Sequence, residues 1–103
     1  MAIQRMVGVQ VHDEAGYQTY RAQMTPLLEG AGGRFVVDVR VAEVLRAPEG
    51  ATFNRLFTIR FPTEEAMDGF FSDPAYLAVR AAHFDTSVSA TALLGTYEVL
   101  EPV

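Results

Sequence analysis

Residues 35–61, FVVDVRVAEVLRAPEGATFNRLFTIRF, contain two runs of alternating apolar and polar side chains on either side of a turn segment. Alternation with a period of two is typical of a β-strand with one buried face. Pro48 and Gly50 mark the turn, and we expect the first strand to continue to about Leu45. The segment therefore predicts an antiparallel hairpin, whose core face comprises Phe35, Val37, Val39, Phe57 and Ile59.

The second face of this hairpin mixes charged and apolar side chains. It comprises Arg34, Val36, Asp38, Arg40, Leu56, Thr58 and Arg60. Such a surface is too apolar for plain solvent exposure and too polar for a second core, so we expect it to pack against the sheet of a second subunit. Arg34 and Arg60 are also candidates for binding a carboxylate ligand, because a guanidinium forms bidentate pairs with carboxylates. Salt bridges to Asp38, within the sheet or between subunits, explain the same arginines equally well.

A helix is predicted on each side of the hairpin. Asp13 stands where an N-cap is needed, and apolar residues then recur at helical spacing up to the glycine-rich segment 30–33. Thr63 is suited to cap a second helical region in the same way. Residues 72–74, Ser-Asp-Pro, interrupt that region and restart it, because Asp73 can cap and proline is favoured at the first position of a helix.

One further strand is predicted near each end of the chain. Residues 3–11 alternate, and Arg5 is the one polar residue on their apolar side. Residues 89–100 return to the Thr, Ala, Leu, Tyr and Val composition of a strand. The order βαββαβ is the split βαβ arrangement of a ferredoxin-like α+β fold, with a four-stranded antiparallel sheet and two helices on one face. No linker divides the sequence, so we expect residues 1–103 to form a single domain.

The composition excludes several classes of function. The 103 residues include no cysteine and no lysine, which rules out disulfides, thiolate nucleophiles, lysine Schiff bases and a Walker-type phosphate loop. The net charge of −5 and the scattered arginines predict no binding to nucleic acid. No apolar run is long enough to cross a membrane, and the first residues do not resemble a signal peptide, so we expect a cytoplasmic protein. Two histidines far apart in the sequence give no metal-ligand spacing, and we expect no metal or other cofactor.

A set of short motifs covers most of the chain: Tyr20, Pro26, residues 32–34 (Gly-Gly-Arg), residues 61–66 (FPTEEA) and residues 72–76 (SDPAY). Together they resemble the small uncharacterised domains of the dimeric α/β-barrel superfamily, in which two ferredoxin-like sheets join back to back. The resemblance implies this fold and a homodimer. It names no reaction, because the motifs are strand ends, helix caps and helix interruptions.

The resemblance leaves two classes of function open. Members of the superfamily include cofactor-independent monooxygenases, lactone isomerases, haem enzymes and ligand-sensing modules. It therefore implies a homodimeric small-molecule protein, either a cofactor-independent oxygenase or isomerase, or a non-catalytic ligand-binding or accessory dimer. A pocket lined by His83 and a tyrosine would favour the enzyme, and a filled interior would favour a non-catalytic binding or accessory module or a dimer that serves only as a scaffold.

Two groups of side chains are candidates for a site. His83 and Asp85 lie near the predicted end of a helix, where the carboxylate could orient the histidine as a general base. A surface histidine favoured by the negative end of the helix is the simpler interpretation. Tyr17, Tyr20 and Tyr76 could hydrogen-bond a small aromatic ligand between helices and sheet. Tyrosines at helical spacing are also common in cores, and the sequence leaves both interpretations open.

Overall fold

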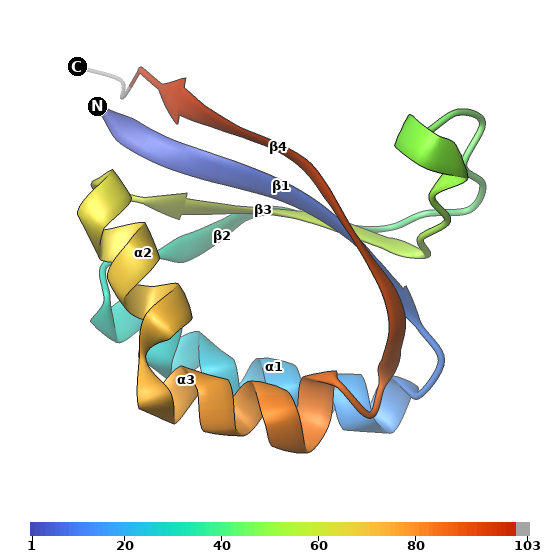
Figure 1. Cartoon of the computed structure of the whole chain (residues 1–103), viewed down its shortest axis with the longest axis horizontal. Coiled ribbons are helices and arrows are strands. Elements are labelled where there is room, and N and C mark those ends of the chain that lie inside the picture. Colours follow the sequence, from blue (N-terminus) through green and yellow to red (C-terminus); the bar gives the residue numbers. More distant parts are fainter. Residues whose placement is uncertain (101–103) are drawn as a thin grey trace.

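The computed structural model describes residues 1–100, in which four antiparallel strands form one sheet in the order β2-β3-β1-β4 (Figure 1). The elements are β1 (Ala2–Val11), α1 (Glu14–Gly30), β2 (Arg34–Arg40), β3 (Arg55–Phe61), α2 (Glu64–Ser72), α3 (Pro74–Val79) and β4 (Val88–Val99). Two short helical segments are η1 (Pro48–Gly50) and η2 (Arg80–Phe84). The helices α1, α2 and α3 cover one face of the sheet (Figure 1). The predicted ferredoxin-like βαββαβ fold is confirmed.

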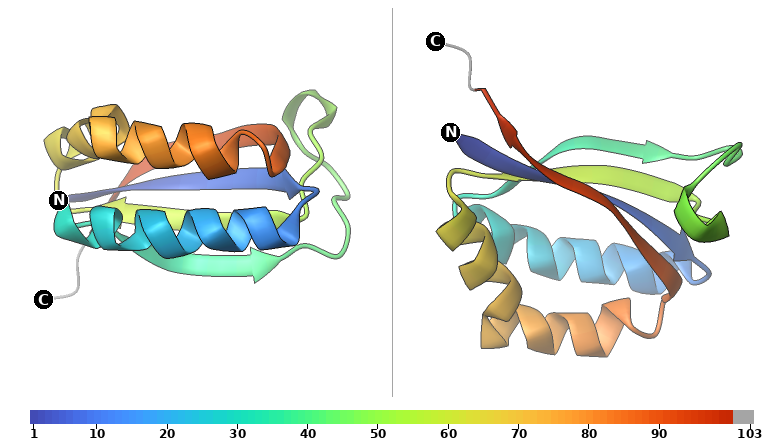
Figure 2. Two further views of the ribbon diagram at one scale, coloured as in Figure 1. Left: turned by 90° about the horizontal axis from the view of Figure 1, so that it is seen from below. Right: turned by 45° about the horizontal axis from the view of Figure 1, so that its top comes forward.

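The predicted helix starts have the expected caps. Asp13 and Thr63 each accept a hydrogen bond from the backbone amide three residues later, at 3.0 and 3.1 Å. Asp73 accepts one from the amide two residues later at 2.9 Å, so the second helical region divides into α2 and α3 as predicted. Figure 2 shows α1 beside α2 and α3 in one layer over the sheet.

The core lies between the sheet and the helices and is rich in aromatic rings. Its buried residues are Val7, Val9, Val11, Tyr17, Tyr20, Met24, Leu28, Phe57, Ile59, Phe61, Met67, Phe70, Tyr76 and Phe84. Phe61 of β3 and Phe70 of α2 pack with their ring centres 5.7 Å apart. Burying a side chain of this kind contributes about 1.5–3 kcal/mol, so this contact fixes α2 against the sheet.

A β-bulge in β2 reverses the predicted facing of that strand. Phe35 lies opposite Ile59 on the face covered by the helices, as predicted. The register then shifts, because Val36 is an extra residue in the strand, and Val37 lies opposite Thr58. The Val37 amide donates a hydrogen bond to the Thr58 hydroxyl at 2.9 Å, which stabilises the shifted register.

The predicted facing is therefore wrong for four residues. Val37 and Val39 were expected in the core, but they lie on the outer face of the sheet and are 42% and 46% exposed. Asp38 and Arg40 were expected on the outer face, but they turn toward α1, where each pairs with a side chain of opposite charge. The strand also ends at Arg40 rather than near Leu45.

The connection between β2 and β3, residues 41–54, rises on the side of the sheet away from the helices (Figure 1). Phe53 of this connection packs on Gly8 of β1. A Cβ atom at position 8 would lie 2.6 Å from the Phe53 ring, so this close approach requires glycine. The connection is thereby held against the outer face of the sheet.

Candidate functional site

A cavity of about 190 Å³ lies between the sheet and the helices. Most of its wall is aromatic or aliphatic. These residues are Val7, Tyr17, Tyr20, Met24, Phe35, Phe57, Ile59, Phe71, Tyr76, Phe84 and Leu93. Leu93 of the edge strand β4 is 60% exposed, which indicates that the cavity meets solvent along this strand. Bulges in its pairing with β1 accompany the bend of β4 toward the helices, seen in Figure 1.

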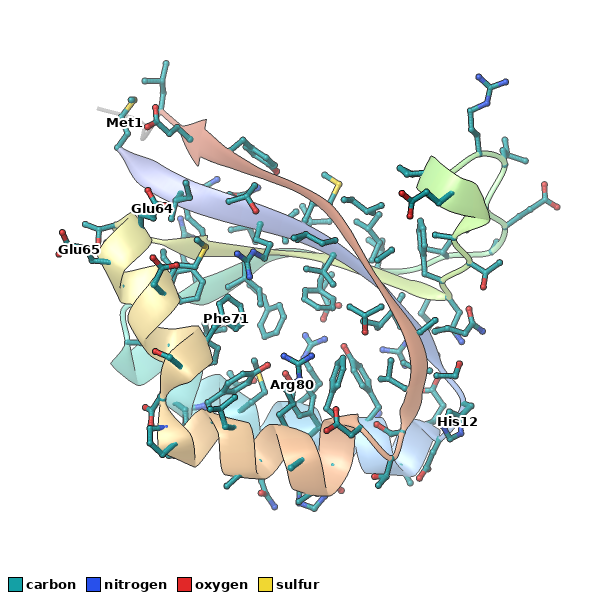
Figure 3. All side chains as sticks on the ribbon, in the orientation of Figure 1. Met1, His12, Glu64, Glu65, Phe71 and Arg80 are labelled. Carbon is teal, nitrogen blue, oxygen red and sulfur yellow. The ribbon has the colours of Figure 1, made fainter. Side chains whose placement is uncertain are left out.

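Three arginines, Arg5, Arg21 and Arg80, supply the charge in this wall. They come from β1, α1 and η2, which are far apart in the sequence. In Figure 3, Arg80 and Phe71 point into the space between the helices and the sheet. The cavity thus combines apolar walls with a few cationic groups, the usual composition of a small-molecule site.

Tyr20 and Tyr76 form a buried hydroxyl pair in the cavity wall. Their oxygens lie 2.9 Å apart, and their rings meet edge to face with centres 6.4 Å apart. Burial, together with the neighbouring Tyr76, raises the pKa of Tyr20 far above its usual value. Tyr20 is therefore a neutral phenol at physiological pH. In such a pair one hydroxyl donates to the other, which leaves one proton for a third oxygen.

Arg21 connects α1 to the bulged strand β2. Its guanidinium donates to an Asp38 carboxylate oxygen at 2.5 Å and to the Tyr17 hydroxyl at 3.1 Å, and it lies 3.8 Å from the centre of the Phe35 ring. Burial by itself would lower the pKa of Arg21, but the hydrogen bonds to Asp38 and Tyr17 outweigh it and raise the pKa. Burial raises the pKa of Tyr17, against the opposing effect of Arg21. Arg21 is thus a permanent cation whose charge Asp38 compensates.

Arg5 has a different environment. Its guanidinium lies 4.8 Å from the centre of the Phe71 ring, and its Nε donates to the Thr96 hydroxyl at 3.4 Å. Among residues 1–100, no carboxylate lies within ion-pair distance of Arg5. The charge of Arg5 is therefore uncompensated by the described part of the chain.

Arg80 lies on the helical side of the cavity. Its guanidinium is 5.2 Å from the centre of the Phe84 ring and 3.9 Å from an Asp85 carboxylate oxygen. Both charged side chains are partly exposed, at 43% and 59%, so solvent screens this pair and Asp85 compensates Arg80 only weakly.

The candidate site residues predicted from the sequence lie in separate places in the structure. Tyr17, Tyr20 and Tyr76 come together in the cavity wall. Arg34 and Arg60 lie opposite each other on the outer face of the sheet. Arg60 donates there to the Gln4 side chain at 2.8 Å, and Gln4 donates to the Tyr97 hydroxyl at 2.9 Å.

His83 and Asp85 lie in and just after η2, and neither lines the cavity. The backbone carbonyl of His83 accepts a hydrogen bond from the Ser87 hydroxyl at 2.6 Å, and Asp85 approaches Arg80. The general-base role assigned to these two residues stays a prediction.

The sequence interpretation missed the three cavity arginines. Arg5 did carry a signal, because it is the polar exception on the apolar side of residues 3–11. Arg21 and Arg80 carried none, since an arginine on a helix is usually solvated. Within residues 1–100 no group of three or more His, Asp or Glu side chains is placed to hold a metal ion. No helix in that range is both long and apolar enough to cross a membrane.

Fold and cavity together define a ferredoxin-like α+β domain with a cavity between its sheet and its helices. The chain belongs to the DUF1330 family, a domain of unknown function, whose model matches residues 5–97. No curated protein matches the sequence.

Solved structures agree on the fold. A protein of unknown function from Rhodopseudomonas palustris is 20% identical, with a TM-score of 0.77 over 98% of this chain and 84% of that one. A dimeric ferredoxin-like protein of unknown function from Bacteroides fragilis is 12% identical, with a TM-score of 0.58 over 95% and 96% of the two chains. SnoaB, a cofactor-independent oxygenase from Streptomyces nogalater, is 15% identical, with a TM-score of 0.64 over 99% and 96%.

Proposed function

We propose that this protein is a homodimer that binds a small aromatic molecule in the cavity of each subunit. The observation that carries the proposal is the cavity of about 190 Å³ with aromatic walls and a small number of polar groups. A purely structural module would fill this space with side chains, because protein interiors pack as densely as organic crystals.

Cofactor-independent oxygenation or isomerisation is the reaction class that suits this wall. The Tyr20 and Tyr76 hydroxyls and the guanidinium groups can stabilise negative charge on a substrate oxygen in a site partly shielded from water. The structural likeness to a cofactor-independent oxygenase is consistent with this chemistry. The substrate of such a reaction would have to reach these donors already ionised, as an enolate or phenolate, because the described residues of the wall supply no base to take its proton.

Binding without turnover is the second candidate, and one observation favours it. The residues of the described chain that line the cavity include no histidine and no carboxylate, so the wall offers no ordinary general base. A catalytic role for His83 and Asp85 would place the reacting atoms outside this cavity.

The outer face of the sheet supports the homodimer. Val36, Val37 and Val39 of β2 are 39%, 42% and 46% exposed there, and Tyr97 of β4 is 38% exposed. Apolar surface of this kind gains free energy when a second copy covers it. The structurally similar protein from Bacteroides fragilis is dimeric.

Blocking the cavity tests the binding function. Leu93→Trp enlarges an exposed side chain of the cavity wall and leaves the core residues in place, so we expect the protein to stay folded. Toluene, phenol and benzamide, titrated into the wild type and followed by NMR, should shift the signals of cavity residues. The Leu93→Trp variant should lose these shifts.

Leu77→Trp is the matched control, because Leu77 is 44% exposed on α3 and lies outside the cavity wall. It should bind the same compounds as the wild type. Shifts that persist in Leu93→Trp would contradict the proposal, as would a wild type in which neither these compounds nor benzoate shifts any cavity residue.

A further inference from the structure

Among residues 1–100, no carboxylate compensates one of the cations around the cavity. Arg21 forms a short, two-point pair with Asp38. Arg80 has a partly exposed partner in Asp85, 3.9 Å away. Arg5 has no acidic partner in residues 1–100, although the chain as a whole carries a net charge of −5. The cavity is thus locally positive in an acidic protein.

Arg5 is half-buried in the cavity wall. It lies in the middle of β1, where Ile3 and Val7 point to the same face and pack in or against the core. Partial burial of a guanidinium without a counter-ion raises its free energy, although by less than full burial would. Nε of Arg5 bonds the Thr96 hydroxyl, and none of the described residues accepts from its two terminal nitrogens. These two nitrogens form the fork that matches a carboxylate.

The surroundings of Arg5 select a flat ligand. Phe71 lies under its guanidinium, and the rings of Tyr76 and Phe71 meet with centres 5.8 Å apart. An apolar cavity of about 150 Å³ accommodates one benzene ring. The cavity here, at about 190 Å³, has room for one ring and a small substituent.

We propose that the cavity binds a planar aromatic monocarboxylate of about the size of benzoate, with its carboxylate paired to Arg5. The proposal rests on the binding function proposed above and specifies the ligand of that same site. Arg80 adds a second, weakly compensated positive charge at the cavity, and the free proton of the Tyr20–Tyr76 pair provides a further donor. One uncompensated guanidinium matches a single negative charge.

Affinity measurements with three probes test this ligand class. Benzoate carries ring and charge, benzamide carries the ring without the charge, and acetate carries the charge without the ring. Titration of the wild type by NMR should give a benzoate affinity at least about tenfold higher than that of either other probe. Benzamide lacks the charge-assisted bidentate pair, which is stronger than a neutral hydrogen bond, and acetate lacks the ring.

Two variants then test whether Arg5 is the cation that pairs with the carboxylate. Arg5→Gln should weaken benzoate binding by about tenfold or more and weaken benzamide binding much less, because the amide carries no charge for Arg5 to pair with. A circular dichroism spectrum like that of the wild type shows that this variant is folded. Arg34→Gln removes the same charge from the outer face of the sheet and should bind benzoate like the wild type. If Arg5→Gln is unstable, the comparison of the three probes on the wild type still tests the proposed ligand class.

The outcomes separate the two proposals. Equal affinity for benzamide and benzoate, or full benzoate affinity in Arg5→Gln, would overturn the carboxylate class and leave the binding function standing. Absence of binding by toluene, phenol, benzamide and benzoate alike would overturn both.

Discussion

At the scale of single residues, burial decides which groups of the cavity carry charge. Tyr20 is 5% exposed, and its hydroxyl bonds the Tyr76 hydroxyl, so burial disfavours the phenolate and raises the pKa of Tyr20. Arg21, in contrast, keeps its charge because Asp38 and Tyr17 accept its hydrogen bonds. The cavity therefore offers both neutral hydroxyl donors and cations.

The raised pKa of Tyr20 predicts alkaline destabilisation. An unfolded tyrosine ionises near pH 10, and the folded Tyr20 ionises higher. The stabilising contribution is thus complete below about pH 10 and is lost as the pH rises from there toward the folded pKa. Tyr20→Phe removes this dependence, so its free energy of unfolding should fall less steeply between about pH 9 and about pH 11. At neutral pH it should cost about 1 kcal/mol, because the Tyr76 hydroxyl loses its partner.

Urea unfolding at a series of pH values measures this slope. Phe84→Leu is the matched control, because the Phe84 ring packs 5.0 Å from the Tyr20 ring and carries no titratable group. It should lower stability equally at every pH. Identical slopes for the wild type and Tyr20→Phe would show that Tyr20 ionises as readily folded as unfolded.

At the scale of elements, the bulge in β2 allows this strand to form an ion pair with α1. It turns Asp38 toward Arg21, whereas regular alternation would have left Asp38 on the outer face. The neighbouring strand β3 stabilises the bulge, since the Thr58 hydroxyl accepts a hydrogen bond from the Val37 amide. By stabilising the bulge, Thr58 of β3 helps to place Asp38 beside Arg21, whose charge Asp38 compensates at the cavity.

A double-mutant cycle tests this facing. Arg21→Gln and Asp38→Asn should be non-additive by about 0.5–1 kcal/mol in the free energy of unfolding, a value limited by the 42% exposure of the Asp38 side chain. Arg34→Gln and Asp38→Asn should add, because Arg34 lies on the outer face. Additivity in the first cycle would place Asp38 away from α1 and refute the bulged register.

At the scale of the whole molecule, the two faces of the sheet have different partners. The helices cover one face of the sheet (Figure 1) and enclose the cavity. The other face carries exposed valines of β2, the strand that leads into the 41–54 connection. A second copy on the outer face would bury these valines without touching the cavity wall. Dimerisation and ligand binding should therefore be separable by mutation.

The proposed dimer predicts a mass of about twice 11.3 kDa in light scattering at micromolar concentration. Val39→Glu places a charge on an exposed residue of the outer face and should shift the protein to the monomer, with its circular dichroism spectrum retained. Leu77→Glu makes the same kind of change on α3 and should remain dimeric. A monomeric wild type would remove the basis for the interface.

The sequence by itself determined the order of the elements and the class of fold. Strand alternation and caps at Asp13, Thr63 and Asp73 are local signals, which depend on residues within a few positions of one another, and the structure confirms them. The facing of β2 was decided only by the tertiary structure, because a bulge depends on pairing with a strand some twenty residues away. The charge distribution of the cavity also depends on the tertiary structure. Arg5 lies over the Phe71 ring, and Arg21 pairs with Asp38, only once the helices are packed on the sheet.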